Sequence, residues 1–196
     1  MCNEIVLNAQ NNIADSLVKY YYLSTNYIDN PTYKEKFFDY FPNDFNTFIN
    51  VYGYKEIIND KKEHDVLFSP LYDFSFSHID FFYSLDKLID TLKFCKKIIS
   101  VSLNGFWESD GVSIFQKFFQ TKLFNNIDIN LYILNTLSAK ECLSVYYFLF
   151  DGPHPDNYKE KYERLYHQIL LKDKKQAQLL KRSYKKLLKE NHCHGH

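Results

Sequence analysis

The spacing of apolar residues in the middle of the chain places the strongest constraint on its fold. Residues 99–103 alternate between apolar and small polar side chains, and residues 127–133 alternate in the same way. A period of two is typical of a β-strand, whereas residues 111–124 between them have apolar side chains three and four positions apart, as in an amphipathic helix. Strand, helix and strand in this order predict a βαβ unit with parallel strands.

A third apolar run, DVLF, precedes this unit by about 30 residues, the usual length of one βαβ step, and extends it to βαβαβ over about residues 66–134. Apolar residues at helical spacing precede the unit and follow it up to residue 190. We therefore predict one α/β domain over residues 1–190, with a small, mostly parallel sheet, a helical N-terminal segment and a C-terminal helical hairpin. The run NEIVL near the start could add a strand, and the alternative fold class is mainly α.

Several polar residues stand where helices are expected to begin. Asn30 precedes Pro31, a pair that suits an N-cap and the first helical position. The tetrapeptide SAKE (residues 138–141) has the spacing of a capping box, and Asp173 with Gln176 repeats this spacing near the C-terminus. These signals predict helices that begin at about residues 31, 139 and 174.

The composition narrows the classes of partner. The formal net charge is zero, which argues against general binding to nucleic acid or to anionic membranes. Residues 1–90 nevertheless carry 14 acidic and 7 basic side chains, and residues 91–196 carry 10 acidic and 17 basic ones, so the two halves attract each other or serve different partners. Aromatic residues make up 18% of the chain, which reflects either the codon bias of an AT-rich genome or an aromatic contact surface.

The cysteines and the N-terminus indicate the compartment. The four cysteines are scattered without a CxxC pair, so no disulfide framework is expected and a cytoplasmic location is predicted. The N-terminal residues lack the features of a signal peptide. The longest apolar run, VYYFLF, is too short to cross a membrane.

The C-terminal residues 191–196 form a tail of potential metal ligands. Imidazole and thiolate groups bind Zn, Ni or Cu, and four of them occur within five residues. The candidate ligands are His192, Cys193, His194 and His196. The alternative is a tail that binds metal adventitiously, and no other cofactor is predicted.

The predicted sheet also locates a candidate ligand site. Ligands of parallel sheets bind beyond the carboxyl ends of the strands, so the three loops there are expected to converge on one edge. The residues that could line this edge are Tyr72, Asp73, Asn104, Trp107, Glu108, Asp110 and Asn135. Glu108 and Asp110 are candidates for a general acid or base, and the other five for ligand contact.

Charge and ring chemistry restrict what could bind at this edge. Glu108 and Asp110 stand at a predicted helix N-terminus, where they would repel a phosphate. Trp107 between carboxylates suits a sugar, a ribose or a basic side chain of a protein partner. The alternative is that these residues only turn the chain and begin a helix.

The segment IISVSLNGFWESDGVSIF (residues 98–115) resembles, with its flanks, a segment of sirtuin-like and AbiH-type phage-defence proteins. The resemblance implies NAD binding. However, NAQNN stands where those proteins carry a glycine-rich nucleotide loop after their first strand, so NAD is not among the predicted cofactors.

Three hypotheses of function follow. The first is a non-enzymatic cytoplasmic protein that binds another protein or itself, of an interaction, immunity or antitoxin type; it rests on the aromatic excess, the opposite charges of the two halves and the lack of a catalytic motif. The second is a small α/β enzyme or binding protein, phage-defence-like, that acts on a nucleoside or sugar through Glu108 or Asp110. The third is a metal-handling protein that uses the C-terminal tail.

Overall fold

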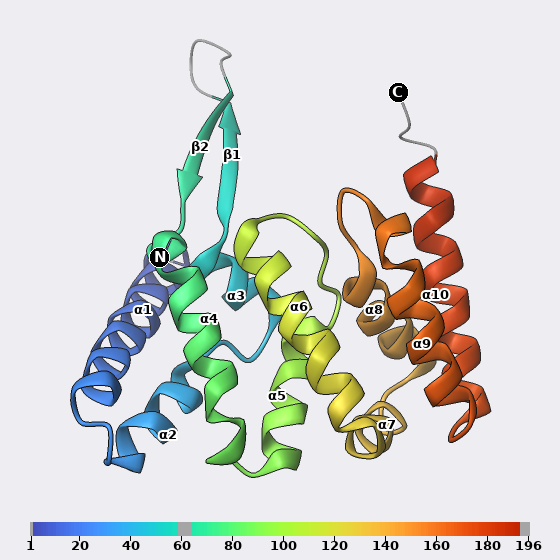
Figure 1. Cartoon of the computed structure of the whole chain (residues 1–196). Coiled ribbons are helices and arrows are strands. Elements are labelled where there is room, and N and C mark those ends of the chain that lie inside the picture. The colour runs from blue at the N-terminus through green and yellow to red at the C-terminus, as the bar shows by residue number, and fades with distance from the viewer. Residues whose placement is uncertain (1, 59–63, 193–196) are drawn as a thin grey trace. The chain divides into compact units, whose positions relative to one another are not determined.

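The computed structural model describes residues 2–58 and 64–192, with side chains for 12–57 and 65–190, and shows a mainly α protein (Figure 1). Ten α-helices dominate these residues, which are 76% helical, and their only strands form a two-stranded antiparallel hairpin. The predicted parallel βαβαβ sheet is therefore wrong, and the mainly α alternative matches the structure.

The strand predicted over residues 99–103 is wrong: residues 99–102 form the end of a helix, α5 (Thr91–Ser102). Ile98, Ile99, Val101 and Ser102 are all buried, so α5 is covered on several sides and a five-residue alternation does not reveal its period. The Ser102 hydroxyl donates a hydrogen bond to the Ile98 carbonyl oxygen at 2.8 Å, the bond that a serine makes within a helix.

The other predicted strands meet different outcomes. Residues 127–133 lie in α7 (Ile127–Leu134), where the buried Asn130 amide donates to the Asn126 carbonyl oxygen at 2.9 Å. NEIVL lies in the long helix α1 (Cys2–Asn26). DVLF is a strand, but its antiparallel partner is the run just before it in the chain.

The chain forms two compact units. Unit 1 comprises Met1–Thr91 and Ser109–Ile114, and unit 2 comprises Leu92–Glu108 and Phe115–His196. The prediction of one domain over residues 1–190 stays a prediction.

Unit 1 contains four complete helices and the hairpin. Its elements are α1, α2 (Pro31–Tyr40), α3 (Phe45–Tyr52), β1 (Tyr54–Ile58), β2 (His64–Phe68), the short 3₁₀ helix η1 (Tyr72–Phe74), α4 (Ser75–Ser84) and η2 (Leu85–Lys87). The Asn30 side chain accepts a hydrogen bond from the Thr32 N–H at 3.0 Å, which confirms the predicted cap of α2.

The core of unit 1 is made largely of aromatic rings. Phe41 and Phe82 stack with ring centroids 3.9 Å apart, and Phe38 stacks on Phe82 at 5.5 Å. His78 is almost completely buried beside the rings of Tyr21 and Phe37, and the Tyr52 hydroxyl lies 3.2 Å from its Nδ1 atom. Many of the 18 phenylalanines are thus explained by core packing.

Unit 2 is built on helices. Its elements are α5, most of α6 (Asp110–Asn125), α7, α8 (Ala139–Phe150), η3 (Pro155–Tyr158), α9 (Lys159–Leu170) and α10 (Lys174–His192). The capping box of Ser138 and Glu141 is confirmed at the start of α8. The C-terminal hairpin is confirmed too: α9 and α10 pack together, and the Asp173 carboxylate accepts the Gln176 N–H at 3.0 Å.

Within the residues that the structure describes, no helix combines the length and the apolar character needed to cross a membrane.

Candidate functional site

The sheet edge on which seven predicted site residues were expected to converge does not exist, because the parallel sheet does not form. Tyr72, Asp73 and Asp110 belong to unit 1. The other four, Asn104, Trp107, Glu108 and Asn135, belong to unit 2. Each group is described with its own unit.

In unit 1 the structure brings Tyr72 and Asp110 together. Burial, followed by the negative charge of Asp110, raises the pKa of the Tyr72 hydroxyl, and a hydrogen bond between the two side chains adds to this effect. Asp110 is the first residue of α6, and Asp73 is exposed beside Tyr72 in η1. The contact joins η1 to the start of α6, a structural role that requires no ligand.

In unit 2 the loop after α5 is fastened to α8. Asn104 has a positive φ of 55°, and its N–H donates to the Ser144 hydroxyl oxygen at 3.2 Å. The Trp107 N–H donates to a carboxylate oxygen of Asp151 at 2.6 Å, and the Trp107 side chain is 37% exposed. The backbone of this loop is thus held at two points along one helix.

Asp151, which was not among the predicted site residues, accepts the second of these hydrogen bonds. Its carboxylate also accepts the Gly152 N–H at 3.0 Å. Burial raises the pKa of Asp151 even though both backbone donors stabilise its charged form. The position of Asp151 directly after the apolar run VYYFLF is a signal that could have identified it as a helix-end residue.

Asn135 belongs to a polar network at the start of α10. Its amide donates to the Asp173 carboxylate at 2.8 Å, and its oxygen accepts from the Gln176 amide at 2.9 Å. Both polar atoms of the Asn135 side chain therefore already form hydrogen bonds within unit 2. Glu108 is half-buried in unit 2, and an acid or base role for Glu108 or Asp110 stays a prediction.

The predicted metal ligands lie at the end of the described chain. His192 is the last residue of α10, and Cys193, His194 and His196 lie outside the described residues. Among the residues that the structure does describe, no three His, Cys, Asp or Glu side chains gather in a way that could hold a metal ion. The metal site therefore stays a prediction.

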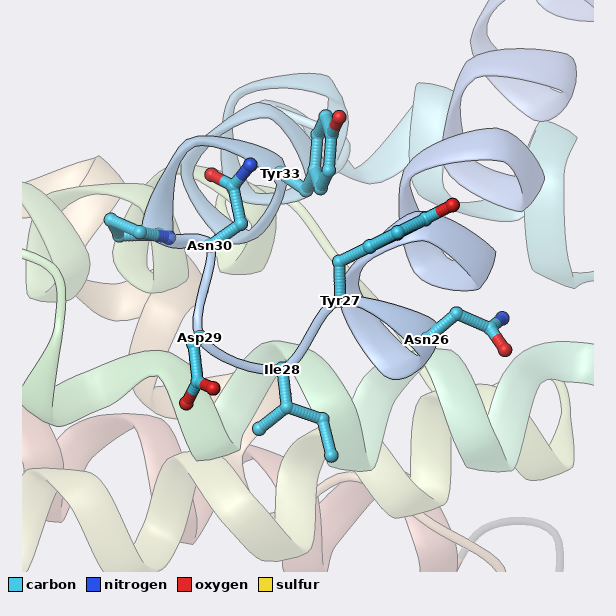
Figure 2. A pocket seen from close by; sticks show the side chains of 7 residues that line it. Asn26, Tyr27, Ile28, Asp29, Asn30 and Tyr33 are labelled. Atoms are coloured by element: carbon cyan, nitrogen blue, oxygen red, sulfur yellow. The ribbon is translucent and has the colours of Figure 1, made fainter.

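The turn between α1 and α2 forms an open hollow (Figure 2). Figure 2 shows Ile28 and Asp29 pointing away from the rings of Tyr27 and Tyr33, whose centroids lie 5.9 Å apart. Asn30 already caps α2. The hollow is consistent with a capped helix turn, and its lining offers no convergent polar groups.

The hairpin of β1 and β2 is a more distinctive feature of unit 1, and Figure 1 shows it extending beyond the ends of α3 and α4. Its base is anchored by three hydrogen bonds. The Ser69 N–H donates to Gly53 at 3.0 Å, the Leu71 N–H to Val51 at 2.9 Å, and the Ser69 hydroxyl to Ile49 at 2.8 Å, each time to the carbonyl oxygen. An isolated two-stranded hairpin is barely stable in water, so these hydrogen bonds at the base help to stabilise the β1–β2 hairpin.

Aromatic rings add to the support of the hairpin base. Phe68 and Tyr72 have ring centroids 4.5 Å apart, and Tyr54 lies within 6.4 Å of both rings. Because Tyr72 also contacts Asp110, the base of the hairpin is tied to the start of α6. This is the structural setting of the predicted site residue Tyr72.

Both faces of the hairpin expose apolar side chains. Val66 (42% exposed) and Phe68 (56%) share one face, and Ile57 (41%) and Leu67 (59%) share the other, as the pairing register requires. The predicted parallel sheet would have enclosed DVLF, so this exposed surface was not expected from the sequence. Two five-residue runs, YKEII and HDVLF, around a short polar segment were the available hairpin signal.

The outer edge of β2 is partly covered by the chain itself. Ser69 and Gly53 form a hydrogen-bonded pair, and in an antiparallel ladder every second pair is of this kind. The backbone N–H and C=O groups of Val66 and Phe68, which lie in the other pairs, therefore point away from β1. The Asp65 carboxylate accepts the Val66 N–H at 2.8 Å. Charged side chains at such edges hinder pairing with strands of other molecules.

No protein-family model matches the chain, and comparisons with curated proteins and with solved structures find no match.

Proposed function

We propose that this chain is a protein-binding protein whose β1–β2 hairpin inserts into a cleft of a partner protein. One observation carries the proposal: an anchored hairpin exposes apolar side chains on both of its faces. Burying a large apolar side chain contributes roughly 1.5–3 kcal/mol, so Leu67 and Phe68 alone offer a substantial driving force.

Insertion between two walls explains the hairpin better than the addition of a partner strand. A strand added beside β2 would have to displace the Asp65 carboxylate from the Val66 N–H. A cleft that encloses the hairpin would cover Val66 and Phe68 on one side and Leu67 on the other without that displacement. Because the base is already ordered, binding would require little further ordering of the backbone.

Charge indicates the chemistry of the cleft. Residues 1–90, which contain the hairpin, carry 14 acidic and 7 basic side chains. Glu56 and Asp65 are exposed on the described part of the hairpin itself, together with one exposed base, Lys55. The proposed partner cleft therefore has apolar walls and basic residues at its rim, and complementary charge would speed association.

Photo-cross-linking tests this proposal with a matched pair of exposed leucines. A benzophenone side chain replaces either Leu67 on the hairpin or Leu171, which is 88% exposed in the turn between α9 and α10. The full chain is then irradiated in its native cells. We expect one partner protein to be cross-linked from position 67 and not from position 171.

A second substitution shows whether the apolar face drives the binding. Phe68→Ser in the position-67 chain should lower the yield of the cross-linked product about 10- to 100-fold, as expected for the loss of one buried ring. Cross-links of equal yield from positions 67 and 171 would overturn the proposal. A product containing only two copies of this chain would assign the hairpin to self-association instead.

A further inference from the structure

Unit 2 contains a groove between α8, α10 and the turn after α5. Its volume is about 660 Å³, within the range of about 300–1,000 Å³ that is usual for small-molecule sites. Helix residues of α8 and α10 form most of its lining, and Asn104 and Gly105 close one part of it. Asn104, a predicted ligand residue, thus lines a cavity of this size.

Cationic side chains dominate the charge of the groove. Lys140, Arg182 and Lys186 line it together with one acid, Glu190, which lies 3.6 Å from the Lys186 ammonium group. Within the described part of the chain, no carboxylate lies within ion-pair distance of Lys140 or Arg182. The four side chains together leave the groove with a net charge of about +2.

Part of the lining of the groove is apolar. Leu143 and the ring of Tyr147 line it, and the Lys186 ammonium group lies 5.3 Å from the centre of that ring. Burial, and then the charge of Asp151, raises the pKa of the Tyr147 hydroxyl, so it stays neutral, and it is hydrogen-bonded to Glu190. This apolar part of the lining therefore suits a ring or another apolar body.

The neutral hydroxyl groups in the groove are already engaged. The Ser144 hydroxyl donates to the Glu141 carbonyl oxygen at 2.8 Å, and the Ser183 hydroxyl donates to the Leu143 carbonyl oxygen at 2.9 Å. Their protons are thus used inside unit 2. An anion in the groove would be bound by the three cationic side chains.

We propose that this groove binds a small phosphate monoester that carries a ring. A phosphate monoester has a charge of about −1.5 to −2 at pH 7, which matches the net charge of the groove. The Arg182 guanidinium group suits two-point binding of phosphate oxygens, and Lys140 and Lys186 add charge. The ring lies on Leu143 and Tyr147. This site is independent of the proposed hairpin interaction because it lies entirely in unit 2.

Isothermal titration calorimetry with phenyl phosphate tests the site on the full chain. We expect binding of phenyl phosphate, weaker binding of benzoate and inorganic phosphate, and none of phenol. Arg182→Gln should weaken phenyl phosphate binding about 10- to 100-fold, the usual effect of losing a hydrogen bond to a charged group. Thermal unfolding of each variant verifies that it is folded.

Lys185→Gln is the matched control. Lys185 is exposed on the same helix but does not line the groove, so its loss should change the affinity less than about 2-fold. An equal loss in Lys185→Gln, or the absence of phenyl phosphate binding, would overturn the proposal. Inorganic phosphate or benzoate binding as tightly as phenyl phosphate would also overturn it, because the groove would then recognise only charge or only an aromatic acid.

Discussion

The two units fill their interiors with different chemistry. Unit 1 packs aromatic rings against each other, and the stacked pair of Phe41 and Phe82 is fully buried. Unit 2 buries several amide side chains among its apolar residues. Gln116 donates to the Phe148 carbonyl oxygen at 2.6 Å and Gln120 to that of Leu149 at 2.8 Å, both on the last turn of α8.

The difference predicts two kinds of sensitivity to mutation. Removing a ring from unit 1 leaves a cavity, and the loss of stability grows with the volume of that cavity. Removing one amide from unit 2 instead leaves a buried polar partner without its hydrogen bond. Both units should therefore depend on the volume of their buried rings, and unit 2 should depend in addition on keeping its hydrogen-bonded amide pairs complete.

The largest effect is expected from Phe82→Ala in α4 of unit 1. Phe82 packs on Phe41 and Phe38, so its loss should lower the free energy of unfolding by about 3–5 kcal/mol. Urea unfolding followed by circular dichroism measures the change. Phe76→Ala in the same helix removes a ring that is 64% exposed and should cost less than about 0.5 kcal/mol. Equal losses in the two variants would contradict an aromatic core.

The next effect comes from His78, the titratable group inside the aromatic core. Burial lowers its pKa from 6.5 to about 4, so the unfolded chain binds a proton more readily than the folded chain. The stabilisation is complete above about pH 6.5 and is lost as the pH falls towards 4, by about 3 kcal/mol in total. The facing groups are the rings of Tyr21, Phe37 and Phe74 and the Tyr52 hydroxyl.

Urea unfolding at a series of pH values between 7 and 4 measures this dependence. His78→Gln removes the titrating group and should flatten the pH dependence relative to the wild-type chain. His154→Gln removes an exposed histidine and should leave it unchanged. A wild-type slope that survives in His78→Gln would assign the pH dependence to other groups.

Local signals in the sequence correctly predicted where three helices begin. The Asn30 cap, the Ser138 capping box and the Asp173 cap each join residues at most three positions apart. These hydrogen bonds therefore depend on the local sequence and not on how the helices pack. The fold class failed because it depended on a period read from five to seven residues. In α5 and α7 that stretch is too short to separate a strand from a helix covered on several sides.

The two surfaces proposed to bind partners, the groove of unit 2 and the β1–β2 hairpin, were predicted only in part from the sequence. Asn104 was selected, but for a sheet edge, and its left-handed backbone and position in the groove follow from packing against α8. Lys140 and Arg182 are about 40 residues apart in the chain, and only the packing of α8 on α10 places them in one groove. The exposure of Leu67 likewise depends on the sheet having no third strand within the described residues, which no local pattern specifies.

The smallest of these effects is expected in unit 2, at Gln176. Its amide group links Asn135 to the buried Tyr146, whose hydroxyl donates to the Gln176 oxygen at 3.1 Å. Gln176→Leu should lower the free energy of unfolding by about 1–3 kcal/mol, because the Tyr146 hydroxyl loses its acceptor. The fluorescence of Trp107, the single tryptophan, reports the unfolding of unit 2 in urea.

A second substitution separates the orphaned hydroxyl from a simple packing defect. Tyr146→Phe combined with Gln176→Leu removes both partners, so the double variant should be more stable than Gln176→Leu alone. Gln178→Leu, at an exposed position of the same helix, should have little effect. If the double variant were the less stable one, the cost would arise from altered packing around Leu at position 176 and not from the Tyr146 hydroxyl, and the importance of paired amides in unit 2 would not hold.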